Sequence, residues 1–321
     1  MSITIKANAA GSGQNSLLQR AWKDLRKNYI LYLLLLPGFL NLILFKIGPM
    51  GAMAIAFQNF SPAQGIFRSP WVGIQNFARI FQDNYIPTVL INTVILAVLS
   101  IVIVFPIPIL FSLLLNEINQ KFVHGFVQSF SLLPYFISAA VMVSIAYSML
   151  SPAGGIVNNI ITASGGTAID FMSKPEWFRP LYVLMDVWQN TGYSAIIYIA
   201  AIMNIDPALY EAAEVDGASR WNKMFHITLP CISTTVIVML IISVGNIFTV
   251  NLDRILLMYN PSIYSTADVI QSYVYRIGFQ SKGFPDYSYG TAVNILKSII
   301  AFVLVIVVNK CADKFSESRL F

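Results

Sequence analysis

Five residues in one otherwise apolar stretch have side chains that could bind a solute. Asp186, Gln189 and Asn190 are polar, and the aromatic residues Trp188 and Tyr193 stand among them. A sugar presents flat apolar ring faces and many hydroxyl groups, so it needs aromatic rings to stack on and amides or carboxylates as hydrogen-bond partners. The cluster predicts a pathway for a polar, sugar-like solute. Polar residues of this kind also join neighbouring helices, and the sequence leaves that alternative open.

Other polar residues occur in or beside two later apolar stretches. Asn294 and Lys297 are three residues apart, so they share one face of a helix. Lys297 could bind an anionic solute, pair with Asp186, or extend its amine to the membrane surface. These further candidates for the solute pathway are Asn246, Asn251, Tyr273, Arg276, Asn294 and Lys297.

The residues from 204 to 230 contain start and stop signals for two short helices. Asp206 can cap a helix whose first residue is Pro207. Gly217 can adopt the left-handed conformation that ends a helix, and Ser219 can cap the next one. Pro230 is expected to end that second helix. A compact helix-turn-helix with small residues at its tip is therefore predicted.

The composition places the chain in a membrane. Hydrophobic residues make up 56% of it, charged residues 11%, and the mean hydropathy is +0.67, whereas soluble domains contain about 25% charged residues. The net charge of +5 does not indicate nucleic-acid binding, because no basic run with interleaved aromatic residues occurs. Lys and Arg are instead expected at the cytoplasmic margins of a membrane protein.

Six apolar stretches are long enough to cross a bilayer, which needs about 20 helical residues. We therefore expect an all-α membrane protein with six transmembrane helices. Basic residues before the first stretch place the N-terminus in the cytoplasm, and six crossings return the C-terminus to that side. The expected stretches are 29–52, 89–115, 126–150, 181–203, 231–250 and 289–309.

This topology divides the chain into three parts. Residues 1–28 form a cytoplasmic N-terminal segment, residues 29–309 the transmembrane domain, and residues 310–321 a cytoplasmic tail. It also places the 204–230 loop inside the cell.

Basic residues toward the predicted outer side suggest an anionic solute. Arg254, Arg276, Lys282 and Lys297 stand there, against the usual preference of basic residues for the cytoplasmic side. Such residues favour an acidic solute or an acidic partner surface. The acidic residues Asp253, Asp268 and Asp286 stand among them, so the sequence leaves a neutral solute open.

The 204–230 loop resembles the signature loop of the membrane subunits of ATP-binding-cassette (ABC) importers. The pattern is Glu-Ala-Ala at 211–213, Asp-Gly at 216–217, and Phe, Ile and Leu-Pro at 225, 227 and 229–230. The resemblance implies the type I importer permease fold, in which this loop is a cytoplasmic coupling helix that docks into an ATPase. It assigns the coupling role to Glu211, Ala212, Ala213, Asp216, Gly217, Ala218, Arg220 and Phe225.

Stretches outside the loop narrow the resemblance. Residues 71–81, 150–160, 175–181 and 268–278 are similar to carbohydrate-uptake permeases. They resemble in particular the polysaccharide branch, whose members import oligosaccharides cut from polymers such as alginate or pectin. These stretches are less specific than the loop, so they support a sugar without naming one.

The resemblance implies the partners. They are a second six-helix permease subunit that forms a heterodimer, two cytoplasmic ABC ATPase subunits, an extracytoplasmic solute-binding protein and the oligosaccharide, in the lipid of the bacterial cytoplasmic membrane. ATP and Mg would be bound by the ATPases, because no phosphate-cradling Gly-Lys-Ser/Thr loop occurs here. We therefore expect a chain without catalytic residues, metal ligands or cofactor, and not an enzyme.

An ion-coupled secondary transporter of a small polar solute is the alternative. Such a transporter would be expected to carry several carboxylates within its spans as proton or sodium relays. In this sequence Asp186 is the one that lies well inside a span.

Overall fold

The computed structural model describes residues 17–280 and 284–315. Described residues up to Ala54 form one compact unit, and those from Ile55 onward form another. All the named elements in these ranges are helical, and the only strand-like pairing recorded there is an isolated bridge between Gln58 and Trp71. The prediction of an all-α fold is confirmed.

The first unit is dominated by one long apolar helical path. From Tyr29 to Phe57 the chain is helical for 29 residues and apolar enough to cross a membrane. No residue of Tyr29–Leu42, the first helix of this path, is buried. This helix therefore needs lipid or another helix around it. The elements are α1 (Leu17–Lys27), α2 (Tyr29–Leu42), the π-helical turn η1 (Ile43–Ile47), α3 (Gly48–Met50) and η2 (Gly51–Phe57), which continues into the second unit.

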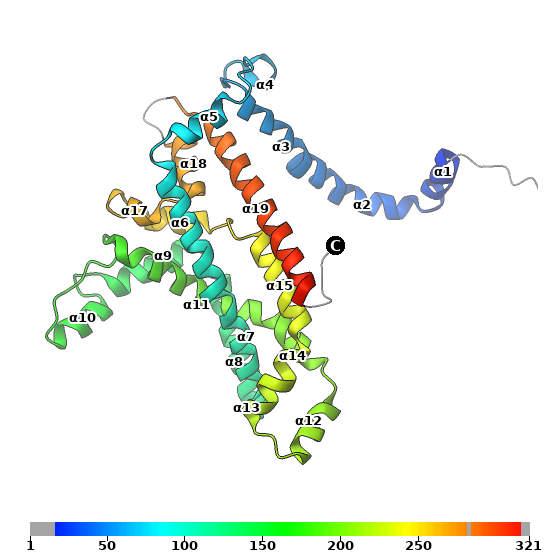
Figure 1. Ribbon diagram of the computed structural model, residues 1–321, viewed down its shortest axis with the longest axis vertical. Coiled ribbons are helices and arrows are strands. Elements are labelled where there is room, and N and C mark those ends of the chain that lie inside the picture. Colours follow the sequence, from blue (N-terminus) through cyan, green and yellow to red (C-terminus); the bar gives the residue numbers. More distant parts are fainter. Residues whose placement is uncertain (1–16, 281–283, 316–321) are drawn as a thin grey trace, which may run out of the picture. The chain divides into compact units, whose positions relative to one another are not determined.

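Two helical paths of the second unit are also continuous and long enough to cross a membrane (Figure 1). The first runs over 31 residues, Ile86–Asn116, and the second over 24 residues, Tyr287–Lys310. They correspond to the predicted stretches 89–115 and 289–309. The elements are α6 (Ile86–Leu99), η3 (Ser100–Val104), α7 (Pro106–Asn116) and α19 (Tyr287–Phe315).

Three further candidate spans are bent pairs of helices, with bends of 99°, 72° and 62°. If each bent pair is one span, the described residues contain the six spans that the sequence predicts. In the first pair, α8 (Lys121–Leu132) and η4 (Leu133–Phe136) are followed by α9 (Ala139–Leu150). In the second, α11 (Pro175–Met203) is followed by α12 (Pro207–Val215). In the third, α13 (Arg220–Lys223), η5 (Met224–Thr228) and α14 (Leu229–Cys231) form one helix that is followed by α15 (Ser233–Gly245).

Two of the predicted stretches differ in detail from the structure. The stretch 126–150 breaks because Pro134 lies in a 3₁₀ turn and the backbone of Ser138 is extended. Ser138 then caps a new helix, because its hydroxyl oxygen accepts a hydrogen bond from the amide of Val141 at 3.4 Å. The stretch 231–250 is helical only to Gly245, and residues 246–250 form turns and coil.

Three prolines follow π-helical turns. They are Pro49 after η1, Pro106 after η3 and Pro230 after η5. In each case the residue before the proline donates an amide hydrogen bond to the carbonyl oxygen five residues earlier in the chain. A π turn widens the helix, which makes room for a ring that would clash with the preceding turn. The helix therefore passes through Pro230 and ends one residue later, at Cys231, before a bend of 62°, so the predicted end at Pro230 is one residue early.

Shorter helices connect the spans of the second unit. They are α4 (Gly65–Arg68), α5 (Gln75–Gln82), α10 (Ile156–Ala163), α16 (Leu252–Met258), η6 (Pro261–Ile263), α17 (Tyr264–Ala267) and α18 (Ile270–Phe279).

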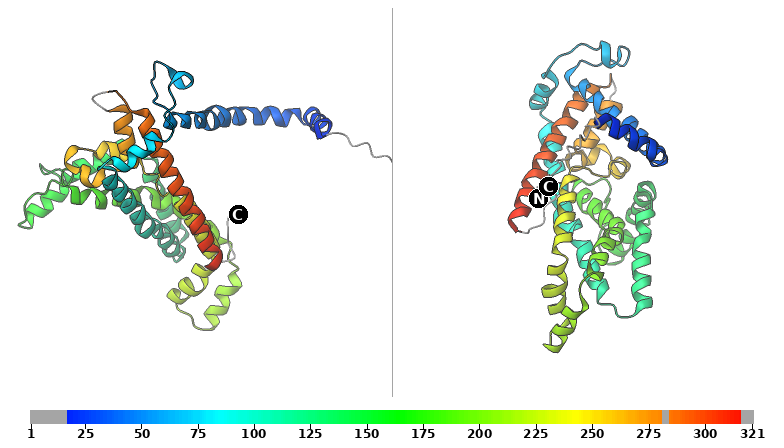
Figure 2. Two further views of the ribbon diagram at one scale, coloured as in Figure 1. Left: turned by 45° about the horizontal axis from the view of Figure 1, so that its top comes forward. Right: turned by 90° about the vertical axis from the view of Figure 1, so that its right-hand side faces the viewer.

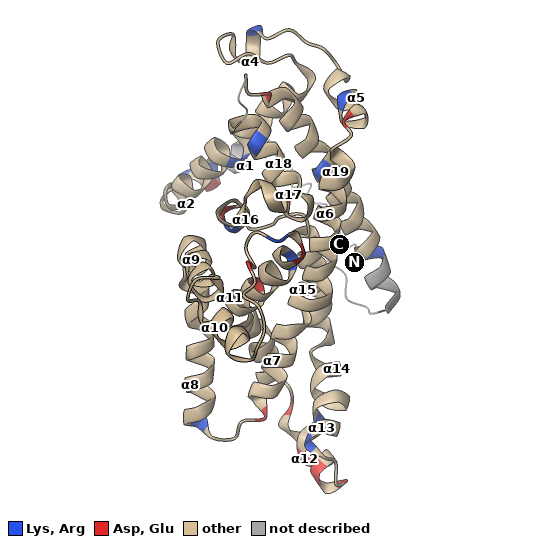
Figure 3. Ribbon diagram, turned by 90° about the vertical axis from the view of Figure 1, so that its left-hand side faces the viewer, with Lys and Arg blue, Asp and Glu red and all other residues tan. Residues whose placement is uncertain are grey.

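Helix α11 is central to the packing of the second unit. It lies against α7 and α8, while α19 lies against α15 and α18 (Figure 2). At Gly192 the approach to α8 is so close that an added Cβ would lie 2.1 Å from the carbonyl oxygen of Ser131. Charged residues are concentrated at the ends of the spans and in the connections (Figure 3).

Candidate functional site

The 204–230 loop begins and turns as its sequence predicts. Asp206 caps α12 by accepting a hydrogen bond from an amide of the first turn at 2.9 Å. Gly217 has a φ of +72°, a conformation that glycine adopts without strain. Its amide bonds to the carbonyl of Glu214 at 3.0 Å, and the amide of Ala218 bonds to the carbonyl of Ala213 at 2.9 Å. These are the paired bonds of a Schellman motif, which close the helix and reverse the chain.

Two side-chain contacts join the two arms of the loop. Lys223 Nζ and Glu214 Oε1 form an ion pair at 2.6 Å. The hydroxyl groups of Tyr210 and Thr228 are 2.8 Å apart. Because Thr228 lies in η5, this second contact connects α12 to the helix that leads into α15. The loop is therefore a well-defined helix-turn-helix.

The predicted coupling residues lie on the surface of this loop. Glu211 forms no ion pair with any residue in the described ranges. Val215 is 89% exposed, and the exposed rings of Trp221 and Phe225 stack with their centroids 6.1 Å apart. Apolar side chains exposed beside free charges are typical of a protein interface. Glu211, Ala212, Asp216, Gly217, Arg220 and Phe225 are exposed, and Ala213 and Ala218 are half-buried.

The base of the loop is anchored in the helical bundle. Met224 is 3% exposed and packs in a hydrophobic cluster with Leu113 of α7 and Tyr198 of α11. The same cluster includes Ile232, at the bend between α14 and α15. A force on the loop would therefore reach α7, α11 and α15 through direct contacts.

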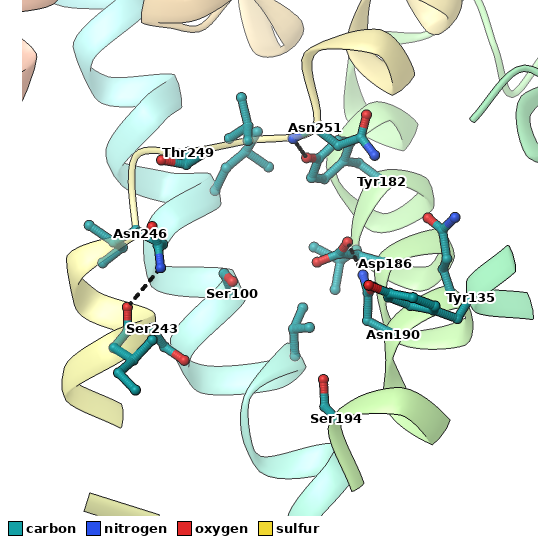
Figure 4. Close-up of a pocket in the computed structure, with 17 residues that line it drawn as sticks. Ser100, Tyr135, Tyr182, Asp186, Asn190, Ser194, Ser243, Asn246, Thr249 and Asn251 are labelled. Atoms are coloured by element: carbon teal, nitrogen blue, oxygen red, sulfur yellow. Dashed lines mark hydrogen bonds between the residues drawn. The ribbon is translucent and has the colours of Figure 1, made fainter. Parts of the chain in front are cut away.

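A cavity of about 770 Å³ lies between α11, α15 and the η3 turn (Figure 4). Its lining offers hydroxyl groups, amides and one carboxylate, and contains no lysine or arginine. Such a surface can exchange hydrogen bonds with the hydroxyl groups of a sugar. The polar residues of the lining are Ser100, Tyr135, Tyr182, Asp186, Gln189, Asn190, Ser194, Ser243, Asn246, Thr249 and Asn251.

The carboxylate of the cavity wall, Asp186, is held by neighbours. Arg254 Nη1 donates to Asp186 Oδ1 at 2.9 Å, and the side-chain amide of Asn190 donates to the same oxygen at 2.9 Å. Arg254 Nη2 also donates to Gln189 Oε1 at 2.5 Å, and the guanidinium lies 5.1 Å from the ring centroid of Tyr182. Arg254 is fully buried behind the wall, so it neutralises Asp186 without facing the cavity.

The structure brings some of the predicted pathway residues together and leaves others apart. Asp186, Gln189, Asn190, Asn246 and Asn251 line the cavity, whereas Trp188, Tyr193, Tyr273, Arg276, Asn294 and Lys297 do not.

The residues outside the lining have other surroundings. Trp188 is 47% exposed on another face of α11. Tyr193 stacks on Tyr135, with ring centroids 3.9 Å apart, and it is Tyr135 that faces the cavity. Lys297 does not pair with Asp186, because Arg254 takes that position.

Tyr273 and Arg276 belong to a second polar cluster, around α18. Arg276 forms an ion pair with the fully buried Asp268, and its guanidinium lies 5.0 Å from the ring centroid of Tyr264. Tyr273 donates a hydrogen bond to Asp83, and burial together with this bond raises the pKa of Tyr273.

Two of the four basic residues considered for an anionic solute are thus neutralised, and Lys297 forms no ion pair within the described ranges. Arg254 and Arg276 each have an acidic partner, and Lys282 lies outside the described residues.

Sequence reasoning missed two tyrosines that line the cavity and the arginine that lies behind its wall. Tyr182 could have been found, because it stands four residues before Asp186 and so shares its helix face. No pattern in the sequence marked Tyr135 as a cavity residue, because it faces the cavity from the 3₁₀ turn at which the helix breaks. Arg254 stands outside the apolar stretches, so its contact with Asp186 was not visible in the sequence pattern.

Comparison with known proteins identifies the family. Residues 104–316 match the family described as "binding-protein-dependent transport system inner membrane component". Two proteins of Bacillus subtilis (strain 168) are similar over nearly the whole chain. The polygalacturonan/rhamnogalacturonan transport system permease protein YteP is 40% identical over 291 residues, 91% of this chain and 90% of that protein. Protein LplB is 38% identical over 297 residues, 92% of each chain.

Two solved structures have the same fold. One is a bacterial ABC transporter involved in the import of the acidic polysaccharide alginate, with a TM-score of 0.84, 38% identity, and coverage of 92% of this chain and 99% of that chain. The other is the bacterial alginate ABC transporter in complex with an alginate pentasaccharide-bound periplasmic protein, with a TM-score of 0.85, 37% identity, and coverage of 94% and 100%. The present chain therefore belongs to the family of binding-protein-dependent transport system inner membrane components and has the type I ABC importer permease fold.

Proposed function

We propose that this chain is the transmembrane permease subunit of an ATP-driven importer of oligosaccharides, and that acidic, alginate-like or pectin-like oligosaccharides are its substrates. One observation carries the proposal. An exposed, well-defined helix-turn-helix and a hydroxyl- and amide-lined cavity occur together in a chain that is 40% identical to a polygalacturonan/rhamnogalacturonan permease.

The cavity supports a sugar more directly than it supports an acid. Its polar groups suit hydroxyls, and its one carboxylate, Asp186, is paired with Arg254. An acidic sugar would therefore meet little net charge on this wall. The acidic substrate class is supported by the relatives, whose names refer to polygalacturonan, rhamnogalacturonan and alginate.

The 204–230 loop supports a separate motor. No phosphate-cradling Gly-Lys-Ser/Thr loop occurs in the sequence, so ATP and Mg would be bound by two partner ATPases. Glu211 is free to meet a basic residue of an ATPase, and the apolar side chains beside it would be covered by the contact. Closure of the ATPases would push the loop, and Met224 and Thr228 would pass the push to α11 and α15, which form the cavity walls.

The remaining partners follow from the same proposal. The exposed apolar surface of α2 suits a second permease subunit and lipid. An extracytoplasmic solute-binding protein would deliver the oligosaccharide, as the complex of a similar transporter with a periplasmic protein suggests. The chain would lie in the bacterial cytoplasmic membrane with both termini in the cytoplasm.

The test is ATPase activity and uptake by the assembled importer in proteoliposomes. Binding protein loaded with a uronate oligosaccharide should stimulate both, and a neutral oligosaccharide of equal length should stimulate them less. Asp216→Lys in the loop should abolish stimulation while membrane insertion survives. Asp253→Lys, which reverses an exposed acidic residue of α16, is the matched control and should keep stimulation.

Two results would contradict the proposal. Equal stimulation by the neutral oligosaccharide would overturn the acidic substrate class alone. Uptake that persists without ATP and collapses with an ion gradient would instead support a secondary transporter. No observation favours that alternative, because Asp186, the one carboxylate that could have carried an ion within a span, forms an ion pair with Arg254.

A further inference from the structure

Helix α1, which precedes the first span, has two chemically different faces. Trp22 and Leu25 are three residues apart, so they share one face, and they are 60% and 45% exposed. Lys23 and Lys27 are four residues apart and lie on the opposite face, also exposed. Arg26 lies between the two faces, with its guanidinium 5.4 Å from the ring centroid of Trp22.

The basic residues of this helix have no acidic partner among the described residues. Lys23, Arg26 and Lys27 form no ion pair there. The acidic residue that stands among them, Asp24, is occupied by groups at the start of α2. Its Oδ1 accepts a hydrogen bond from the side-chain amide of Asn28 at 2.7 Å, and its Oδ2 accepts one from the hydroxyl of Tyr32 at 2.7 Å. The positive charge of α1 is therefore left for an external partner.

The position of α1 along the chain places that partner at the membrane surface. A single residue, Asn28, separates α1 from α2, and it interrupts the helix with a φ of −114° and a ψ of 25°. The apolar span begins at Tyr29, so the C-terminal end of α1 must lie at the membrane surface. Eleven residues with this many charges cannot themselves enter the hydrocarbon core.

We propose that α1 is an interfacial helix that binds anionic lipid headgroups. Trp22 and Leu25 enter the boundary between headgroups and acyl chains, as apolar faces of interfacial helices do. Lys23, Arg26 and Lys27 bind headgroup phosphates, which attract basic residues close to an anionic leaflet. The contacts of Asp24 with Asn28 and Tyr32 fix the turn that lays α1 on the surface while α2 crosses it.

Spin labels on the two faces test this placement in the full-length chain within the assembled importer. Labels are placed by Leu25→Cys or, as the matched control on the same helix, by Lys23→Cys, after Cys231→Ser and Cys311→Ser. The complex is measured in nanodiscs of phosphatidylcholine with and without phosphatidylglycerol. With phosphatidylglycerol, the label at 25 should be reached better by oxygen than by a water-soluble nickel chelate. The label at 23 should show the reverse.

Charge reversal tests the choice of lipid. Lys23→Glu, Arg26→Glu and Lys27→Glu together should make the label at 25 accessible to the chelate, because each basic residue strengthens binding to an anionic surface about fivefold. This loss should occur with phosphatidylglycerol and be absent without it. Lys121→Glu, which changes a basic residue of α8, should have no effect. Tyr32→Phe should increase the mobility of both labels.

Three results would overturn the proposal. Equal chelate accessibility at 23 and 25 with phosphatidylglycerol would show that α1 does not lie on the membrane. If the label at 25 is buried in the membrane equally with and without phosphatidylglycerol, and equally after the charge reversal, anionic headgroups are not bound. Protection of the label at 25 from oxygen and chelate in detergent would show that a protein surface covers the helix.

Discussion

Arg254 and Asp186 are 68 residues apart in the sequence and form an ion pair at 2.9 Å, with the arginine side chain fully buried. Arg254 comes from α16 and Asp186 from α11, so the pair ties the segment after α15 to the helix that forms one wall of the cavity. Removing one partner of a buried pair is costly, because it leaves an uncompensated charge. The shape of this wall therefore depends on a residue that does not face the cavity.

Arg254→Met should lower the free energy of unfolding by about 3–5 kcal/mol, because it leaves Asp186 without its cation. Arg254→Met combined with Asp186→Leu should recover much of that loss, since no charge remains. The measurement is thermal or denaturant unfolding of the purified protein. Arg68→Met, at an exposed arginine, is the control and should change little. A double variant as unstable as the single one would contradict the argument.

Gly217→Ala should weaken coupling between ATP hydrolysis and uptake without preventing folding. An added Cβ meets no atom within 4 Å at this position, so the cost comes only from the φ of +72° and amounts to about 1 kcal/mol. Gly125→Ala is the matched control, because an added Cβ also meets no atom within 4 Å there and the residue is helical. Coupling is measured as sugar taken up per ATP hydrolysed. Equal coupling in both variants would show that the turn tolerates the strain.

The parts of the fold that depend on local chemistry could be predicted. The caps at Asp206 and Ser219 and the turn at Gly217 follow from side chains and backbone freedom a few residues apart, and the structure confirms them. The six apolar stretches follow from composition, because a bilayer selects for length and hydropathy. The polar residues of α11 were recognised for the same reason, since they interrupt such a stretch.

The rest depends on contacts between distant residues. The break near Ile137 combines Pro134 with an extended Ser138, and apolar content alone does not reveal it. Whether Asp186 pairs with Lys297 or Arg254 is decided by which helix packs beside α11. The π turns before three prolines also escaped prediction, because a proline within an apolar stretch equally fits a helix end.

Gly192→Ala should disrupt the packing of α11 against α8. The added Cβ would lie 2.1 Å from the carbonyl oxygen of Ser131, a backbone atom that can move only with its helix. Overpacking of this kind costs about 1–3 kcal/mol or more, so the purified protein should melt at a lower temperature and give less folded material. Gly38→Ala, where an added Cβ meets no atom within 4 Å, is the control. Unchanged melting of Gly192→Ala would show that the two helices are farther apart.

The carboxylate of Asp83 should make stability depend on pH. Its Oδ2 accepts hydrogen bonds from the hydroxyls of Tyr273 and Tyr289, and its Oδ1 accepts one from the amide of Tyr85. Burial alone would raise the pKa of Asp83, but these hydrogen bonds outweigh burial and lower it below its ordinary value. An ionised group stabilised in this way contributes above the unfolded pKa of about 3.9, and the contribution is lost as pH falls through the lower folded pKa.

Asp83→Asn should therefore melt at a lower temperature than the unchanged protein at neutral pH, and the difference should shrink as pH falls below about 4. The two proteins are compared by thermal unfolding in detergent over the acid range, so that the titration of other groups cancels. Asp253→Asn is the control, because Asp253 is exposed and has no ion pair among the described residues. A difference for Asp83→Asn that stays constant or grows toward acid would contradict the lowered pKa, because protonation would then cost the folded state nothing.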